Sequence, residues 1–149
     1  MEIVKEPSKI LHQKLSSVNA ITPEIKALVL AMREAMQAAH GVGLAANQVG
    51  QDLQLFVLEP TLAKENGVPE VYINPEITEY SRDRVEAEEG CLSLPEQWLR
   101  IKRAKKVHLK ALDENGGKIK IKARGFLARV LQHECDHLNG LLIKDRLNQ

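Results

Sequence analysis

The chain has 149 residues, 44% of them hydrophobic, which is the size of one domain and enough to bury a core. Its 21 basic and 20 acidic residues leave a formal charge of +1, which excludes bulk attraction to nucleic acid or to an anionic membrane. The charged start, residues 1–6, has no apolar signal core, and no apolar run reaches the length of a membrane span. We therefore expect one soluble cytoplasmic domain over residues 1–149, with no membrane partner.

Residues 1–20 mix short apolar pairs with polar residues, which predicts an irregular arm with a turn of helix. A helix is predicted from about 23 to 40. Thr22 can cap it, and Pro23 suits its first position. Apolar residues then recur at helical spacing, which is typical of core packing: Ile25, Leu28, Val29, Met32 and Met36.

Residues 41–50, GVGLAANQVG, have glycines spaced as in some phosphate-binding loops. A dinucleotide fingerprint, however, needs a strand before the glycines and a helix after them, whereas here a helix precedes and a strand at 53–58 follows. Two interpretations remain. The segment is either a helix stop with a small-residue turn, or a backbone that lets a ligand approach closely, with Gln48 as an amide donor.

Strand signals follow at residues 53–58, 71–74, 77–80 and from Val85 onward. The turn-rich segment 60–69 and a break at Asn74-Pro75 separate them. Residues 107–111 and 118–122 alternate apolar and polar on either side of a turn at 114–117, which predicts a hairpin. We interpret its lysines as a solvated face, because no aromatic residues interleave with them, and we expect no direct nucleic-acid recognition.

The pattern His-Glu-x-x-His at residues 133–137 is the strongest chemical signal in the sequence. At roughly 100° per residue, His137 lies about 40° around a helix from His133, and Glu134 lies about 100° from His133. Two imidazoles on one face can hold a divalent cation, and the carboxylate beside them can take a proton from water. Apolar neighbours indicate an enclosed helix: Phe126, Leu127, Val130, Leu131 and Leu138.

Burying two imidazoles and a carboxylate without partners would cost roughly several kcal/mol of folding free energy, and a bound cation would remove that cost. The pair Asn139-Gly140 directly after the second histidine predicts the end of the helix.

A catalytic site of this type needs a third protein ligand and one open position. Metzincin peptidases have a third histidine where this chain has Ile143, and no glutamate follows Glu134. The third ligand must therefore come from upstream, where the segment 89–93 with Cys91 is the obvious source, or from Asp145. Cys135 lies about 200° around the helix from the first histidine, so we expect it to point away from the site and to form no disulfide.

Three segments resemble the signature motifs of the peptide deformylases in order and spacing: residues 41–48, 89–93 and 132–138. The resemblance covers nearly the whole chain. It implies a hydrolase that removes the formyl group from the N-formylmethionine of nascent chains and releases formate. It also implies that Cys91, His133 and His137 hold one divalent metal ion, Fe(II) in the cell, with zinc, nickel or cobalt possible in the purified protein.

The same resemblance implies roles for other residues. Glu134 would carry the proton of the attacking water to the leaving amine, and the Gln48 amide and the Leu92 backbone N–H would meet the developing oxyanion. The methionine pocket and the strand that pairs with the peptide would be formed by Val42, Gly43, Gly90, Phe126 and Val130. We also expect Glu89 to pair with Arg103, with a solvent-exposed pair as the alternative.

The sequence departs from the family pattern in two places. Trp98 lies near the position of an arginine that meets the peptide backbone in some members, which puts such polar contacts in doubt. The chain also ends at Gln149 without the long C-terminal helix of some members, so we expect no ribosome docking through such a helix, although a transient ribosome contact stays open.

The predicted fold is α+β: antiparallel strands wrapped around the central helix with the His-Glu-x-x-His motif, and the N-terminal helix packed outside. A metallopeptidase and a non-catalytic metal-binding protein are the rival functions.

Overall fold

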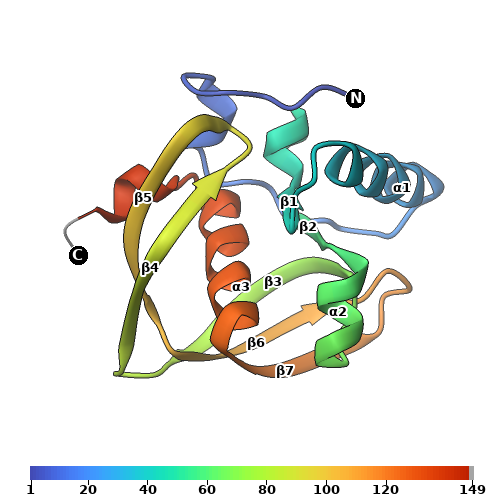
Figure 1. Cartoon of the computed structure of the whole chain (residues 1–149). Coiled ribbons are helices and arrows are strands. Elements are labelled where there is room, and N and C mark those ends of the chain that lie inside the picture. Colours follow the sequence, from blue (N-terminus) through green and yellow to red (C-terminus); the bar gives the residue numbers. More distant parts are fainter. Residues whose placement is uncertain (148–149) are drawn as a thin grey trace.

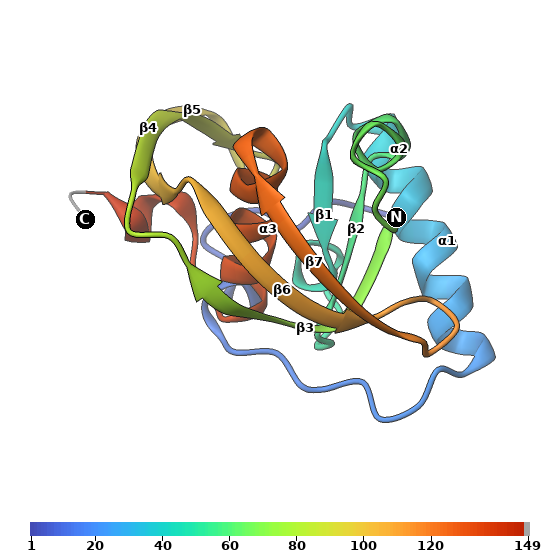
Figure 2. The same cartoon turned by 90° about the horizontal axis from the view of Figure 1, so that it is seen from below.

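A computed structural model describes residues 1–147 and shows one helix enclosed by two antiparallel sheets (Figures 1 and 2). The strands of the larger sheet follow the order β1-β2-β3-β6-β7, and β4 pairs with β5 in the smaller one. Helix α3, which carries the His-Glu-x-x-His motif, lies between the two sheets (Figure 1). This arrangement confirms the predicted α+β class with a central motif helix.

The elements have the following bounds. The strands are β1 (Gly43–Ala45), β2 (Leu55–Leu58), β3 (Val71–Tyr80), β4 (Arg84–Cys91), β5 (Leu94–Ala104), β6 (Lys106–Leu112) and β7 (Lys118–Arg124). The α-helices are α1 (Pro23–Ala38), α2 (Pro60–Asn66) and α3 (Gly125–Leu138). Three short 3-10 helices complete the set: η1 (Lys9–His12), η2 (Ala46–Val49) and η3 (Ile143–Arg146).

Helix α1 confirms the predicted helix and ends two residues earlier than expected. The Thr22 hydroxyl accepts a hydrogen bond from the Ile25 N–H at 3.3 Å, so the predicted cap is present. The apolar stripe of α1 is buried in one cluster with residues of β1 and β2. It includes Val29, Met32 and Met36 of α1 together with Leu44, Leu55 and Val57 of the strands. The helix therefore covers the outside of the larger sheet, on the side away from β4 and β5 (Figure 1).

The predicted break at Asn74-Pro75 is wrong, because β3 runs continuously through it. The register of β3 against β6 shifts between Ile73 and Glu76, which marks a bulge, and a bulge tolerates proline because no ladder N–H is needed there. The Asn74 side-chain amide lies at this bulge. It accepts from the Val18 N–H at 2.8 Å and donates to the Val18 carbonyl at 2.9 Å, which ties the N-terminal arm to the sheet.

Several elements were not predicted from the sequence: α2, β5 and the short β1, η2 and η3. The expected turn-rich segment 60–69 contains α2, whose first N–H groups, those of Thr61 and Leu62, both donate to the Glu59 carboxylate at 2.9 Å. Pro60 in the first position and Gly67 in a left-handed conformation after the end are helix signals that could have been read. Strand β5 has most of its residues exposed between Pro95 and Arg100, so it shows no regular alternation that would have revealed it.

The apolar side of α3 packs against the larger sheet. Leu127, Leu131 and Leu138 lie in one buried cluster with Leu109 of β6 and Ile121 of β7. Because this side of the helix faces the larger sheet, the histidine side faces β4 and β5.

The N-terminal arm confirms the predicted irregular segment with one short helical turn, η1. It also links the segments around the motif helix. The Val4 N–H donates to the Gln48 carbonyl at 2.7 Å, the Ser93 hydroxyl donates to the Val4 carbonyl at 2.6 Å, and the Leu15 N–H donates to the Leu138 carbonyl at 2.9 Å. Among residues 1–147, no helix combines the length and apolar character needed to cross a bilayer.

Candidate metal centre

Three possible metal donors converge between α3 and the end of β4. His133 and His137 extend from successive turns of α3, and Cys91 is the last residue of β4. The Cys91 Sγ lies 3.4 Å from the His137 Nε2, which lies 3.2 Å from the His133 Nε2. The three donor atoms all lie within 4.8 Å of one another. The structure thus brings together the three residues that the sequence resemblance selects.

The orientation of the His133 ring suits a metal ligand. Its Nδ1 lies 3.0 Å from the Glu89 carboxylate, which can only accept, so Nδ1 donates to Glu89 and Nε2 is the nitrogen left for another partner. That Nε2 lies 3.2 Å from the His137 Nε2. One thiolate and two imidazoles match borderline-soft divalent ions, so these residues could hold one such ion.

The two competing candidates lie elsewhere. The Asp145 carboxylate accepts from the Leu142 N–H at 2.8 Å in η3 and is not part of the donor group. Cys135 is buried in the apolar cluster on the other side of α3, as predicted. Both cysteines are free thiols, which confirms that no disulfide forms between them.

Glu134 is a buried carboxylate without a complete set of partners. It is 3% exposed, and no partner among the described residues hydrogen-bonds its Oε1. Burial raises the pKa of Glu134 to about 7. A carboxyl group with a pKa near the working pH can both take up and release a proton, which is the property a general base requires.

Gly43 explains how Glu134 reaches this position. A Cβ atom at Gly43 would lie 2.6 Å from the Glu134 Oε2, closer than real contacts allow. At Gly43 the group that lies close to the backbone is therefore a side chain of the protein. Helix α1 ends before this segment, as the helix-stop interpretation expects, and close approach by a ligand stays a prediction.

The Gln48 side-chain amide, the expected donor, lies beside the candidate ligands. Its Oε1 accepts from the Ala45 N–H at 3.0 Å, which turns Nε2 toward the Ser93 hydroxyl at 3.2 Å and the Cys91 Sγ at 3.6 Å. The side chain is 2% exposed, so its orientation is held firmly. Leu92, whose backbone N–H is the second expected donor, lies in the turn between β4 and β5.

A cavity of about 460 Å³ opens beside these groups, a size typical of small-ligand sites. All five residues expected to bind substrate line it: Val42, Gly43, Gly90, Phe126 and Val130. Gln48, Cys91, His133 and Glu134 also contribute to its wall. Its rim exposes three large apolar side chains, those of Val42, Trp98 and Phe126, so the opening is both apolar and accessible.

A cluster of buried charges supports the donors. The Arg103 guanidinium donates to Glu89 through Nε at 2.9 Å and Nη2 at 2.8 Å, which confirms the expected pair and shows that it is buried. Arg103 also binds Asp136 through Nη1 at 2.5 Å, and Arg129 donates to Glu89 at 2.5 Å. Burial opposes the charged form of Glu89, but hydrogen bonds from Arg103 and His133 outweigh it and hold the pKa of Glu89 well below its usual range.

Arg129 and Asp136 were missed in the sequence. Arg129 precedes His133 by one helical turn, so it lies on the same side of α3, and this spacing was a signal that could have been used. For Asp136, no spacing in the sequence indicated that it would belong to this buried charge cluster. Its partners are Arg103 from β5 and Arg146 from η3, and only the fold brings these segments together.

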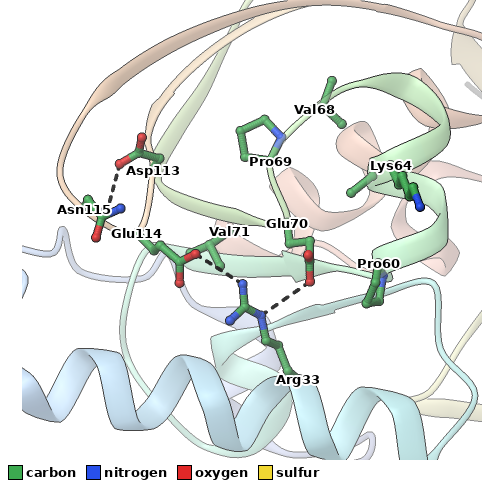
Figure 3. A pocket seen from close by; sticks show the side chains of 11 residues that line it. Arg33, Pro60, Lys64, Val68, Pro69, Glu70, Val71, Asp113, Glu114 and Asn115 are labelled. Carbon is green, nitrogen blue, oxygen red and sulfur yellow. Dashed lines mark hydrogen bonds and ion pairs between the residues drawn. The ribbon is translucent and has the colours of Figure 1, made fainter.

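A second hollow of about 500 Å³ lies between α1, α2 and the turn after β6 (Figure 3). Arg33 binds Glu70 at 3.6 Å and Glu114 at 3.4 Å, as Figure 3 shows. The Asp113 carboxylate accepts from the Asn115 and Gly117 N–H groups. Because Arg33 and all three acids of the hollow already have partners, we assign it no chemical role.

Two histidines on an enclosed helix, a thiol from a neighbouring strand and a buried carboxylate beside an open pocket define the class of hydrolytic metal sites built on His-Glu-x-x-His. The particular family follows from comparison with known proteins. The polypeptide deformylase family model matches residues 1–149, and the chain belongs to this family.

Individual relatives agree with this assignment. A peptide deformylase of Thermodesulfovibrio yellowstonii is 44% identical over 148 residues, covering 99% of this chain and 89% of the relative. Peptide deformylase 1 of Clostridium perfringens is 47% identical over 137 residues, covering 92% of this chain and 90% of the relative. The crystal structure of a peptide deformylase from Thermotoga maritima superposes with a TM-score of 0.91 at 37% identity, covering 99% of this chain and 97% of that one. A peptide deformylase from Synechococcus elongatus in complex with actinonin gives a TM-score of 0.92 at 37% identity, covering 100% and 79% of the two chains.

Proposed function

We propose that this protein removes the formyl group from the N-formylmethionine of peptides by metal-dependent hydrolysis and releases formate. Membership of the family supports this reaction. The observation that carries it is the buried, incompletely bonded Glu134 carboxylate beside three convergent donors, at the wall of an apolar pocket.

In this proposal Cys91, His133 and His137 hold one divalent ion per chain, Fe(II) in the cell, while zinc, nickel or cobalt can occupy the purified protein. The close approach of their donor atoms and the Glu89 hydrogen bond to His133 support the assignment. When bound, such an ion supplies Lewis acidity, which lowers the pKa of a water molecule far below its ordinary value, to about 7, and polarises a carbonyl oxygen.

Glu134 moves the proton. Its Oε1 takes a proton from water as the water oxygen bonds to the formyl carbon, and then delivers that proton to the departing nitrogen. The formyl C–N bond breaks, leaving formate and a free amino terminus. A pKa of about 7 lets Glu134 perform both transfers near neutral pH.

Gln48 and Leu92 stabilise the charge that develops on the formyl oxygen. The Gln48 Nε2, oriented by the Ala45 N–H, and the Leu92 backbone N–H both donate to this oxygen. Removing one such donor typically costs about 2.7 to 4 kcal/mol of transition-state stabilisation.

The substrate enters through the apolar opening. The methionine side chain lies against Phe126, Val130 and Val42, which line the cavity. The peptide extends beside Gly43 and Gly90 as an added strand, because the neighbouring segments already have extended backbone.

We also propose that residues 1–149 act as a single catalytic domain in the cytoplasm, where nascent formylated chains are the partner and a transient ribosome contact accompanies their processing. The packing of α3 against both sheets supports one cooperative unit.

The test uses formyl-methionyl peptide and its acetylated counterpart, with formate and new amino termini as readouts. We expect formate from the formyl peptide only. Glu134→Gln should keep its metal, measured by elemental analysis of anaerobically purified protein, and lose roughly 10²- to 10⁴-fold in rate, because an amide cannot take the proton. Cleavage of internal peptide bonds would show a metallopeptidase, and metal without any hydrolysis would show a non-catalytic protein.

A further inference from the structure

The two hairpins of the molecule carry their surface charges differently. Across β4 and β5, opposite charges face each other, Glu86 with Lys102 and Glu88 with Arg100. Across β6 and β7, cations face each other, Lys106 with Arg124 and Lys110 with Lys120, while Lys122 faces His108. Directly opposite residues share one face of a sheet, and like charges there destabilise it.

Neighbouring acids compensate only part of this charge. From β3, Glu76 lies 3.5 Å from Lys110, and Glu79 lies 2.8 Å from His108. The remaining exposed cations form no ion pair with any residue from 1 to 147: Lys106, Lys118, Lys120, Lys122 and Arg124. With a formal charge of only +1 for the whole chain, this positive face reflects local concentration of charge.

Protection of the sheet edge does not explain the whole face. Strand β7 is the outer strand of its sheet, and lysines on an outer strand prevent pairing with other chains. Strand β6, however, pairs with β3 on one side and β7 on the other, so Lys106 and Lys110 protect no edge.

The geometry of the face suits a row of anions. Alternate residues of a strand are about 6.8 Å apart, so the β7 cations form a regular line. Figure 2 looks toward β6 and β7 on the side away from α3, the helix that carries the metal donors. No large apolar side chain of β6 or β7 is exposed, so the face offers nothing to insert into a bilayer or to stack on bases.

We propose that the outer face of β6 and β7, which we call the β6–β7 face, docks the phosphate backbone of a nucleic acid without reading its sequence. This inference goes beyond the deformylase activity and does not depend on it. It revises the expectation of a merely solvated lysine face, because the cross-strand register that places like charges opposite one another is visible only in the structure.

The test measures binding to a fluorescently labelled RNA duplex by anisotropy at several salt concentrations. One variant combines Lys118→Gln, Lys120→Gln and Lys122→Gln. The matched control combines Lys9→Gln, Lys14→Gln and Lys26→Gln, three exposed lysines outside the face, so both variants lose the same net charge. We expect the first variant to bind at least about tenfold more weakly and its salt slope to fall by about 2 to 3, because each phosphate contact contributes about 0.7 to 0.9. The control should stay within about twofold of wild type.

Three outcomes would overturn the proposal: no saturable binding by the wild type at low salt, equal weakening in both variants, or tighter and variant-sensitive binding to phosphatidylserine vesicles than to RNA. Hydrolysis of formyl-methionyl peptide is measured on the same preparations and should match wild type in both variants. Thermal unfolding should not be lowered in either, and the face variant should gain slightly in stability, because Lys120 no longer lies opposite Lys110. RNA binding that follows the predictions in a protein without deformylase activity would refute the proposed function and leave this inference standing.

Discussion

The hairpins β4–β5 and β6–β7 hold α3 from two sides, and they do so by different forces. On the β4–β5 side, Glu89 receives hydrogen bonds from Arg103 and Arg129, and Arg103 also binds Asp136 of α3. On the β6–β7 side, the contact is apolar and lies within one cluster of buried residues: Val107, Leu109, Ile121, Leu127 and Leu131.

The two sides of α3 therefore contribute differently to the protein. Apolar packing positions the helix, and its contribution depends on buried area and little on pH. The charged side does more, because Glu89 also accepts from the His133 Nδ1 and so sets the orientation of a candidate ligand. Changes on the charged side should therefore alter metal binding and pH dependence, whereas changes on the apolar side should alter stability alone.

The largest effect is expected from Cys91→Ala, on the charged side. Without the thiolate, two histidines bind a cation weakly, so metal content and deformylation should be lost together. Asp145→Asn is the control, because Asp145 bonds the Leu142 N–H away from the donors and its loss should leave the metal in place. Elemental analysis and the formate assay check both. A Cys91→Ala protein with one metal per chain, beside an Asp145→Asn protein without metal, would refute the site.

The next largest effect is expected from Arg103→Met on the charged side, and Leu109→Ala on the apolar side is the variant to compare with it. Breaking a buried pair by removing one partner costs about 3 to 5 kcal/mol. Leu109→Ala should cost about 2 to 5 kcal/mol by leaving a cavity. Urea unfolding in the presence of a chelator measures both free energies.

The pH dependence distinguishes these two variants. The pKa of Glu89 is lower in the folded protein than its ordinary value of 4.5, so its contribution to stability is present above pH 4.5 and is lost as the pH falls toward its folded pKa. The cost of Arg103→Met should therefore be largest near pH 7 and shrink in acid, while the cost of Leu109→Ala stays constant. Equal pH profiles for the two variants would contradict the comparison.

A smaller effect is expected from Gly43→Ala. The added Cβ would meet the Glu134 Oε2 at 2.6 Å and displace the carboxylate, and a misplacement of about 1 Å can cost roughly 10²-fold in rate. The metal should stay, since none of its three candidate ligands moves. Gly41→Ala is the control, because its one close neighbour would be the flexible end of the Leu92 side chain at 3.0 Å, while the Gly43 carbonyl and the Met36 side chain would lie at an ordinary contact distance of 3.5 Å. Steady-state kinetics with formyl-methionyl peptide measure both variants. Equal activity of the two would contradict the claim that a Cβ at position 43 displaces Glu134.

The smallest effect is expected from Cys135→Ala, the apolar counterpart of Cys91→Ala. Cys135 lies in the buried cluster with Leu131 and Leu138, so its truncation should cost about 1 kcal/mol of stability. Metal content and activity should match wild type. Loss of metal from this variant would mean that the two sides of α3 are not separate in function.

The sequence by itself determined the features that depend on local geometry. The two histidines and Glu134 share a helix whose periodicity, apolar neighbours and Asn139-Gly140 stop are all readable within a few turns. The same holds for α1, with its Thr22 cap, and for the β6–β7 hairpin, whose turn and alternation are local signals. For the third ligand, reasoning from the residues left Cys91 and Asp145 open, and the resemblance to known motifs selected Cys91.

Only the tertiary structure decided the contacts between distant segments. The resemblance predicted the pair of Glu89 with Arg103, and the one-turn spacing of Arg129 and His133 was readable on the helix. Only the structure shows that all three meet at Glu89 and so join two strands to a helix. The opposition of Lys110 and Lys120 depends on a cross-strand register that a shift of one residue would abolish. Helical faces repeat every 3.6 residues and can be read along the chain, whereas strand pairing and buried ion pairs depend on which segments meet, and that is settled by packing of the whole core.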